Sequence, residues 1–350
     1  MAHLQNTRLQ KTGLQKACLQ KACLRKIWRH AIPVAAAIAL QIPAGAMGPV
    51  RAQDYPTKLI KLIVPSPPGG GTDTLARLVG AKLSETLKWQ IVADNRPGAG
   101  GNVGLDAAAK APADGYTIAM GESSNLTINP YLYATIPFDA AKDLAPVVLV
   151  GTVPLVLVTS SSSQFDSLAA VVAAAKAKPL FFASGGNGTV GHLTGEIWMR
   201  RAGVTLQHVP YRGGAQAVAD VMGGQVDLNF ASIPAAASLI EAGKLRALAV
   251  TSPKRTAELP TVPTFDEAGF QGFTAQVLYG VLAPAGTPPA IVERLNAEIN
   301  RVLQAPDFKA NAARSGVEIR GGTPEEFAAF PKDERDKWSR AVAASGARVD

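Results

Sequence analysis

Short apolar runs alternate with segments of helical spacing over most of this chain, and this alternation constrains its fold more than any other feature. The run Leu59–Val64 ends at a turn rich in Pro and Gly, and the apolar residues of Asp73–Lys88 then recur at helical spacing. Strands and helices that alternate many times predict an α/β protein with doubly wound parallel sheets. Further strands are expected at Gln90–Ala93, Tyr116–Met120, Val147–Val150, Leu155–Val158, Leu180–Ala183, Leu206–Val209, Val226–Phe230 and Leu245–Val250, with helices that include Leu168–Lys176 and Ala215–Met222.

Two helices towards the C-terminal end carry clear start signals. Thr287-Pro288 places an N-cap residue before a proline at the first helical position. Thr323-Pro324-Glu325-Glu326 has the pattern of a capping box for the last helix. Pro331 falls inside that helix, where its missing N–H group is expected to kink or break it.

The first 52 residues differ from the rest and indicate a leader that is removed on export. They hold eight Lys and Arg and no Asp or Glu, and the basic stretch Arg25–Arg29 precedes an uncharged run, Ala31–Met47. That run is short for a membrane span and is interrupted by Pro, Gln and Gly, which favours a cleaved signal peptide over an uncleaved anchor. Cleavage is expected after Ala52, with Ala46 as a second candidate, and the mature protein is expected in the periplasm.

Charge and cysteine content exclude several functions. The chain has 35 Lys and Arg against 27 Asp and Glu, a net charge of +8, and the whole excess lies in the leader. The remaining 27 bases and 27 acids balance, which argues against nucleic acid as a partner. Cys18 and Cys23 also lie in the leader, so the mature chain has no thiol for a disulfide, a nucleophile or a metal site.

Three loops that follow expected strands have compositions that suit a small anion. The first is Pro65–Asp73, in which prolines stiffen the entry, glycines let backbone N–H groups approach a ligand, and a helix N-terminus follows. Asp73 is expected to cap the first turn of that helix rather than to touch an anion. A plain glycine turn is the alternative. The candidate ligand residues in this loop are Ser66, Pro67, Gly69, Gly70, Gly71 and Thr72.

The second loop, Ser184–His192, has glycines at the spacing G-x-G-x-x-G after a strand. A dinucleotide site also needs an acidic residue about 20 residues further on, at the end of the next strand. That strand ends instead in His208-Val-Pro-Tyr-Arg212, and no acid lies between Glu196 and Asp220. We therefore expect no cofactor, and a carboxylate suits this loop equally well. Its candidate ligand residues are Ser184, Gly186, Gly188 and Thr189.

The third loop, Gly121–Asn125, offers Ser123 and Ser124 as ligand contacts, with an ordinary serine-rich turn as the alternative. Catalytic patterns are missing from the sequence, which has no G-x-S-x-G, no P-loop and no H-E-x-x-H. Only His192 and His208 follow the leader, and we expect both to be structural, His192 by stabilising its loop. The chain is therefore expected not to be an enzyme and to hold no metal.

From residue 53 onward the chain resembles, along nearly its whole length, the periplasmic solute-binding receptors of the tripartite tricarboxylate transporter type, the TctC or Bug family. Each stretch that carries the resemblance is short, but there are many of them, and they occur along the chain in the same order as in the family. They are Tyr55-Pro-Thr-Lys58, Val64-Pro, Pro67-Pro-Gly-Gly, Asp94-Asn-Arg-Pro-Gly-Ala-Gly-Gly-Asn102, Asp114-Gly-Tyr116, Asn129-Pro-Tyr-Leu-Tyr133, the second loop, His208-Val-Pro-Tyr-Arg-Gly213, Gly223-Gly-Gln-Val-Asp227, Gly243–Val250 and Leu282–Thr287.

The resemblance implies a type II periplasmic-binding fold, in which two α/β lobes joined by a two-strand hinge enclose a ligand cleft. Lobe I would comprise residues 53–153 and 277–350, and lobe II residues 154–276. It also implies a monomeric receptor that holds a small carboxylate, or its amide, through backbone N–H groups, hydroxyls and water for uptake by a membrane permease. A receptor that reports its ligand to a sensor kinase is the alternative.

Three places depart from the family pattern and bear on the ligand. Ser66 stands where an aromatic residue is common, which removes ring stacking and leaves room for a larger ligand. Glu122 stands where a small hydroxyl residue is common, and its carboxylate would repel an anion or bind a ligand amine. Ala231 and Ser232 stand where an Asp often follows the strand, so these two candidate contacts lack that link to a ligand amino group.

Overall fold

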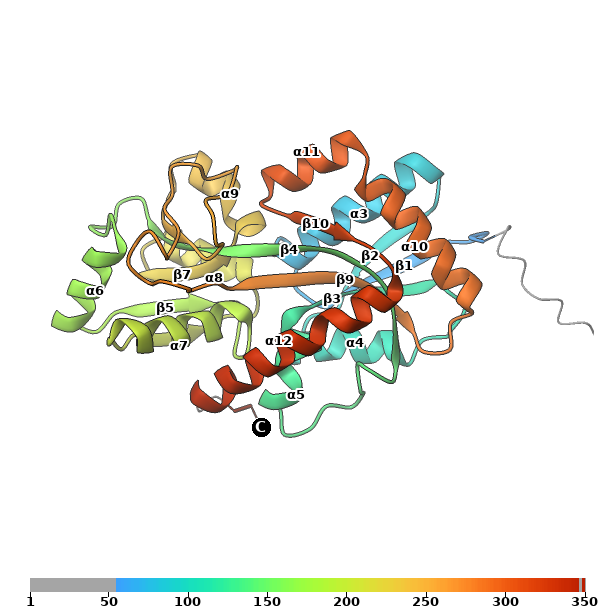
Figure 1. Cartoon of the computed structure of the whole chain (residues 1–350), viewed down its shortest axis with the longest axis horizontal. Coiled ribbons are helices and arrows are strands. Elements are labelled where there is room, and N and C mark those ends of the chain that lie inside the picture. Colours follow the sequence, from blue (N-terminus) through green and yellow to red (C-terminus); the bar gives the residue numbers. More distant parts are fainter. Residues whose placement is uncertain (1–54, 346–347, 350) are drawn as a thin grey trace, which may run out of the picture. The chain divides into compact units, whose positions relative to one another are not determined.

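Two paired strands, β4 and β9, organise the fold because they connect two sheets (Figure 1). β4 spans Leu144–Ser160 and β9 spans Gln276–Pro284, and the two run antiparallel along the first two thirds of β4. The computed structural model describes residues 55–345 and 348–349. The leader expected over residues 1–52, with both cysteines, lies outside the described residues.

The first sheet has the strand order β2-β1-β3-β9-β4. β1, β2 and β3 are parallel, whereas β9 is antiparallel to both β3 and β4. β10 pairs antiparallel with the part of β4 around Gly151. The bounds of the new strands are Ile60–Val64 for β1, Ile91–Asn95 for β2, Thr117–Glu122 for β3 and Glu318–Gly321 for β10.

The second sheet begins where β4 changes partners, between Pro154 and Leu155. Beyond this point β4 pairs antiparallel with β7 and β8, and β7, β5 and β6 follow one another in parallel. The bounds are Phe181–Ser184 for β5, Gln207–Pro210 for β6, Leu228–Ser232 for β7 and Leu245–Val250 for β8.

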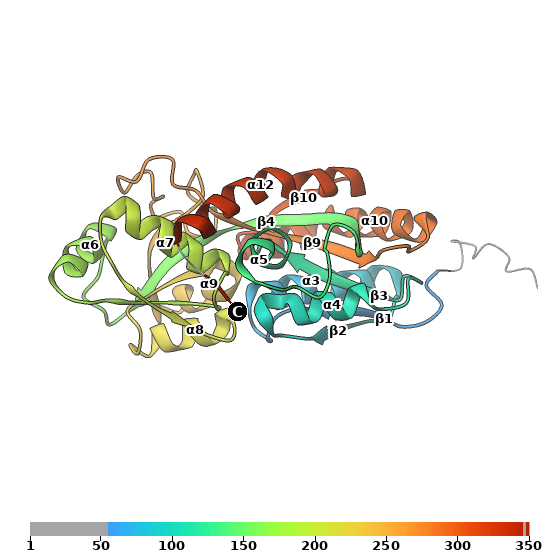
Figure 2. The same ribbon diagram turned by 90° about the horizontal axis from the view of Figure 1, so that it is seen from below.

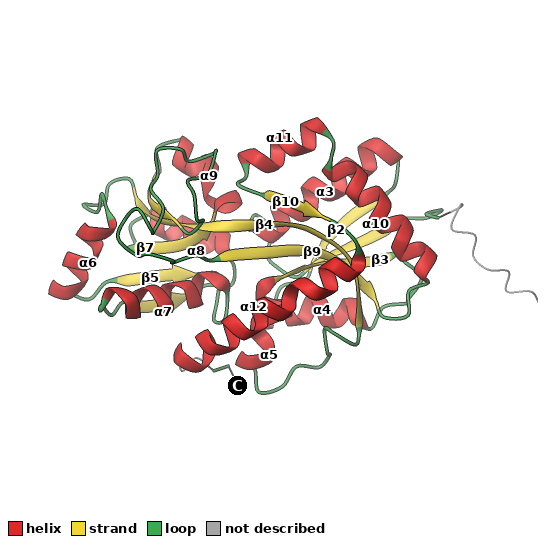
Figure 3. Cartoon of the chain, viewed as in Figure 1, coloured by secondary structure: helices red, strands yellow, loops and turns green. Residues whose placement is uncertain are grey.

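Helices cover both sheets, as the secondary-structure colouring shows (Figure 3). Among them α12 packs against β4, the turn η3 and α7, and so contacts elements of both sheets (Figure 2). The helices and turns are α3 Gly71–Leu87, η2 Ala99–Gly101, α4 Asn102–Ala109, η3 Ser124–Ile128, α5 Asn129–Leu132, α6 Leu168–Ala177, α7 Val190–Ala202, α8 Gly214–Met222, α9 Ile233–Glu241, α10 Pro289–Leu303, α11 Pro306–Arg314 and α12 Pro324–Ser345. The doubly wound α/β architecture predicted from the alternation is confirmed, but the sheets are mixed rather than parallel, because β4, β8, β9 and β10 form antiparallel pairs.

Two sequence expectations about strands and helix starts need correction. Val147–Val150 and Leu155–Val158 are not separate strands but parts of β4, in which every residue from Val147 to Ser160 is buried. A strand buried on both faces has a continuous apolar sequence, so nothing in the pattern marks its length. Thr287 is not the N-cap of α10, because Pro288 holds that position and the Thr287 hydroxyl donates to the Pro284 carbonyl at 2.7 Å.

The last helix confirms one expectation and corrects another. The capping box is present: Thr323 N–H donates to Glu326 Oε2 at 2.7 Å, and Glu326 N–H donates to Thr323 Oγ1 at 3.2 Å. Pro331 does not break the helix, which continues to Ser345. Buried Phe327 and Trp338 anchor it on either side of the proline, and this packing outweighs the loss of one backbone hydrogen bond.

Candidate functional site

The first loop leaves β1 and leads into α3, and the Asp73 side chain fixes its shape. Its carboxylate accepts hydrogen bonds from Gly69 N–H (3.0 Å), Arg77 Nε (2.9 Å) and Asn95 Nδ2 (2.8 Å). Burial disfavours the charged form, but the hydrogen bonds from Arg77, Gly69 and Asn95 outweigh it and hold the pKa of Asp73 below its usual range. Asp73 does not cap the first turn of α3 as expected, because the helix has no side-chain cap; its carboxylate instead binds the N–H of Gly69 in the loop before the helix.

Ser66 and Pro67 form the entry of the same loop. The Ser66 carbonyl accepts a hydrogen bond from Asn95 Nδ2 at 3.0 Å, and the Ser66 hydroxyl points back to the Pro67 carbonyl at 3.4 Å. A methyl group placed on Gly213 would lie 2.8 Å from Pro67 Cγ, and one on Gly69 would lie 3.5 Å from Ala215 Cβ. The first loop thus packs directly against the start of α8, which belongs to the second sheet.

The start of α3 also lies where the two sheets approach. Gly70 is the N-cap and the helix begins at Gly71, so the first N–H groups have no partner within the helix. A methyl group on Gly71 would lie 2.6 Å from Ser232 Oγ and 2.8 Å from the Tyr279 hydroxyl, a spacing that only glycine permits. Ser232 ends β7, so a helix N-terminus of one sheet faces a strand end of the other.

The second loop is held by its own hydrogen bonds. Ser184 is fully buried, and its hydroxyl donates to the Gly186 carbonyl at 3.0 Å and accepts from Gly186 N–H at 3.2 Å. Thr189 is the N-cap of α7: its hydroxyl accepts from His192 N–H at 3.3 Å and donates to the Gly186 carbonyl at 2.9 Å. Gly188 N–H donates to His192 Nδ1 at 3.1 Å, so His192 stabilises this loop as expected.

His192 and His208 stack on each other beneath the second loop, with ring centroids 4.0 Å apart. Burial lowers the pKa of His192 to about 4, and burial together with the neighbouring His192 lowers the pKa of His208 to about 3. His208 Nε2 lies 2.7 Å from Ser184 Oγ. Ser184 is nevertheless inaccessible, and within the described residues no carboxylate binds the other ring nitrogen of His208. The pair therefore supports the loop and does not form a nucleophile with its base.

The third loop joins the first through a half-buried carboxylate. Glu122 ends β3, and its Oε2 accepts a hydrogen bond from Thr72 Oγ1 at 2.5 Å. Burial raises the pKa of Glu122 above its usual range, although hydrogen bonds from Thr72 and Ser124 act in the opposite direction. Ser123 is fully buried, and its hydroxyl accepts from Leu278 N–H at 2.9 Å, so it holds β9 in place.

Two neighbours of these loops were not among the candidate residues. Tyr279 of β9 is 2% exposed, and its hydroxyl lies within hydrogen-bonding reach of Thr72 and Ser232. Gly213 packs on Pro67, as described above. The two consecutive glycines at the start of α8 were a usable signal for Gly213. Nothing in the sequence of β9 distinguishes Tyr279 from a core residue. Ala231 lies buried in β7 opposite Val156.

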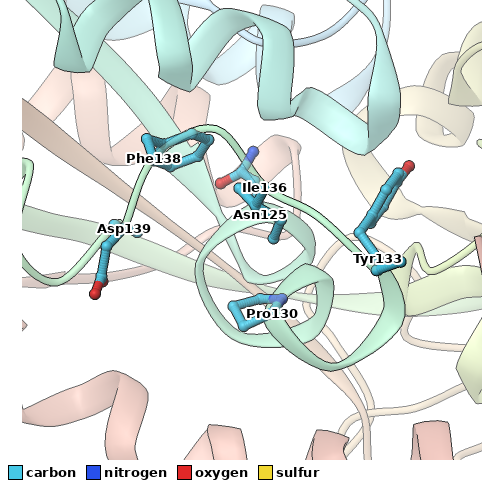
Figure 4. A pocket seen from close by; sticks show the side chains of 8 residues that line it. Asn125, Pro130, Tyr133, Ile136, Phe138 and Asp139 are labelled. Atoms are coloured by element: carbon cyan, nitrogen blue, oxygen red, sulfur yellow. The ribbon is translucent and has the colours of Figure 1, made fainter. Parts of the chain in front are cut away.

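A cavity of about 330 Å³ lies elsewhere in the first sheet's half, beside η3 and α5 (Figure 4). None of the candidate ligand residues lines it, and a smaller cavity of about 160 Å³ adjoins it and includes Arg335. The lining of the larger one is Asn125, Pro130, Tyr133, Ala134, Ile136, Phe138, Asp139 and Ala140.

In the part of the chain that the structure describes, no helix combines the length and apolarity needed to cross a membrane. The same residues contain no cluster of His, Cys, Asp and Glu that could hold a metal ion. Thr72, Ser124 and Ser232 supply hydroxyl groups where the loops meet. This donor set suits reversible binding of a small polar molecule.

Two α/β lobes linked by β4 and β9, with the first loop packed against the start of α8 and the end of β7 across the junction, define a solute-binding protein of the periplasmic type. The chain belongs to the TctC family: residues 75–347 match the model of the tripartite tricarboxylate transporter family receptor. Proteins of this family are periplasmic solute-binding receptors rather than enzymes.

Curated relatives cover most of the chain. It is 42% identical over 312 residues to the UPF0065 protein in the tcbD-tcbE intergenic region of Pseudomonas sp. strain P51, covering 88% of this chain and 93% of that protein. It is 40% identical to protein BugT of Bordetella pertussis, covering 87% of this chain and 95% of BugT.

Solved structures agree with the fold. The structure of R. palustris Rpa4515 with adipate matches with a TM-score of 0.82 at 36% identity, covering 85% of this chain and all of that one. Periplasmic binding protein BugD matches with a TM-score of 0.80 at 31% identity, covering 84% and 99%. MatC (Rpa3494) from Rhodopseudomonas palustris with bound malate matches with a TM-score of 0.77 at 29% identity, covering 82% and 100%.

Proposed function

We propose that this protein is an extracytoplasmic receptor that captures a small carboxylate, or its amide, between its two lobes for uptake by a tripartite tricarboxylate-type transporter. The observation that carries the proposal is the meeting of the first loop with the start of α8 and the end of β7. Gly213 packs on Pro67, and Gly71 packs on Ser232. Adipate and malate, bound by two structural neighbours, support a carboxylate as the ligand class.

The proposal takes residues 53–153 and 277–350 as lobe I and residues 154–276 as lobe II. This division follows the point at which β4 changes partners, between Pro154 and Leu155. The first turn of α3 supplies unpaired N–H groups and the positive end of a helix dipole, both of which stabilise an anion. The second loop, whose shape is fixed by its own hydrogen bonds, then forms the lobe II side of the site.

The remaining candidate contacts have distinct roles in this proposal. Gly71, Thr72, Ser124 and Ser232 face the junction, whereas Ser123 and Ser184 orient the loops from behind. Export by a cleaved signal peptide, a monomeric state and a permease partner belong to the same proposal. A sensor kinase as the partner stays a prediction that a ligand-dependent pull-down would distinguish.

We expect the refolded, ligand-free protein to bind at least one small carboxylate with one-to-one stoichiometry and a Kd of about micromolar order, which corresponds to about 8 kcal/mol. Hydrogen bonds to a charged group contribute about 1.5–3 kcal/mol each, so three or four suffice after ordering costs. Isothermal titration calorimetry against mono-, di- and tricarboxylates and their amides measures this. Binding to none of them would refute the proposal.

A further inference from the structure

A carboxylate without a cationic partner lies at the junction of the two lobes. Glu122 Oε2 accepts a hydrogen bond from the Thr72 hydroxyl, and Ser124 supplies a second hydrogen bond to the carboxylate. Among the described residues no Lys, Arg or His forms an ion pair with Glu122, although fourteen other ion pairs are present. The nearby Asp73 differs, because Arg77 neutralises it.

Hydroxyl groups from three neighbouring elements face the Glu122 carboxylate. Thr72 comes from α3, Ser124 from η3 and Tyr279 from β9, and Tyr279 is the only titratable side chain among them. The Tyr279 hydroxyl in turn reaches Ser232 at the end of β7. A chain of hydrogen-bonding groups therefore runs from the carboxylate in lobe I to the surface that lobe II presents.

These hydroxyls satisfy hydrogen bonds but supply no charge. Enclosing an ionised carboxylate away from water is unfavourable unless a proton or a cation neutralises it. A ligand with a second carboxylate at this end would place two negative charges together, and one of them would have to take up a proton. A ligand with an ammonium group there supplies the missing charge directly.

We propose that Glu122 selects the charge class of the ligand, so that the receptor prefers an amino-carboxylate whose ammonium group faces Glu122 while its carboxylate lies at the start of α3. This inference rests on the proposed function of capturing a carboxylate between the lobes. It adds the direction in which the ligand lies in the site. It also assigns the choice between an amino-carboxylate and a diacid to the Glu122 side chain.

Matched ligand pairs that differ only at one end test this preference. The pairs are β-alanine against succinate, 4-aminobutyrate against glutarate, and 5-aminopentanoate against adipate, measured by calorimetry at pH 7.5. In at least one pair we expect the amino member to bind about tenfold tighter or more. A diacid that binds as tightly as its partner, or more tightly, in every pair would overturn the proposal while leaving the proposed function intact. Failure of all six ligands and of the wider carboxylate panel would instead overturn the proposed function.

Two variants assign the effect to the side chain. In Glu122→Gln the preference should fall to within about threefold, because the amide keeps the shape but loses the charge. Glu293→Gln is the matched control: Glu293 is an exposed residue of α10, and this variant should keep the full preference. An unchanged preference in Glu122→Gln would refute the role of Glu122.

A measurement on the unaltered protein covers the case in which Glu122→Gln fails to fold. Calorimetry in two buffers with different ionisation enthalpies reports the protons taken up on binding. We expect little uptake with the amino-carboxylates and close to one proton with a diacid. Diacid binding without proton uptake would contradict the proposal.

Discussion

Replacing Gly213 with alanine is expected to weaken ligand binding by about tenfold or more without unfolding the protein. The added methyl group would lie 2.8 Å from Cγ and 3.0 Å from Cδ of Pro67, and a proline ring cannot rotate away. Overpacking of this kind costs about 1–3 kcal/mol. Pro67 follows β1 of the first sheet and Gly213 precedes α8 beside the second sheet, so in the proposed function the cost arises when the lobes close and appears in the Kd for a carboxylate.

The adjacent Gly214 provides the control for this variant. It begins α8, and a methyl group placed on it would meet nothing within 4 Å. Gly214→Ala should therefore bind the ligand as the unaltered protein does. Calorimetry gives the two Kd values, and urea unfolding shows whether either variant has lost stability. Equal affinity in the two variants would mean that ligand capture does not bring Pro67 against Gly213.

Lowering the pH from 7 to 5 is expected to reduce the free energy of unfolding by about 2–4 kcal/mol through the two buried histidines. The pKa of His192 is lowered to about 4 and that of His208 to about 3, mainly by burial. Between these values and the ordinary pKa of about 6.5, the unfolded chain binds protons that the folded chain does not. Stability is therefore fully present above about pH 6.5 and is lost as the pH falls below it.

His208→Gln isolates this contribution, because one buried imidazole remains and the carboxyl groups are unchanged. Urea unfolding at pH 7 and pH 5, followed by tryptophan fluorescence, should show a difference between the two pH values that is about half that of the unaltered protein. The fully buried Trp198 and Trp338 make this signal sensitive to unfolding. The same pH dependence in both proteins would show that His208 remains accessible to protons in the folded state.

The order of strands and helices could be predicted from the sequence because it depends on local spacing. The capping box at Thr323 and the loop role of His192 are also local, since each joins residues three or four positions apart. The continuity of β4 was missed for a related reason. Burial on both faces removes the alternation that would show where a strand begins and ends.

Some residues of the candidate site could be predicted from the sequence, but their arrangement in space could not. Glycine loops after strands pointed to the Gly71 and Gly188 regions, but the sequence gives no sign that Gly69 and Gly188 donate their N–H groups within the protein. Nor could it place Tyr279 beside Thr72, because contacts between residues 207 positions apart depend on the path of β9. Glu122 was noticed as a departure from a family pattern, whereas its lack of a cationic partner became visible only in the structure.

The central claim is that a carboxylate is enclosed by closure of the two lobes, and energy transfer between one dye on each lobe tests it most directly. Cysteines at the exposed positions Glu293 and Lys176, with Cys18 and Cys23 changed to serine, allow selective labelling. We expect the transfer efficiency to change when the tightest-binding carboxylate from the calorimetric panel is added, and to change less in Gly213→Ala than in Gly214→Ala. Saturable binding of that carboxylate with no change in transfer efficiency would contradict the account.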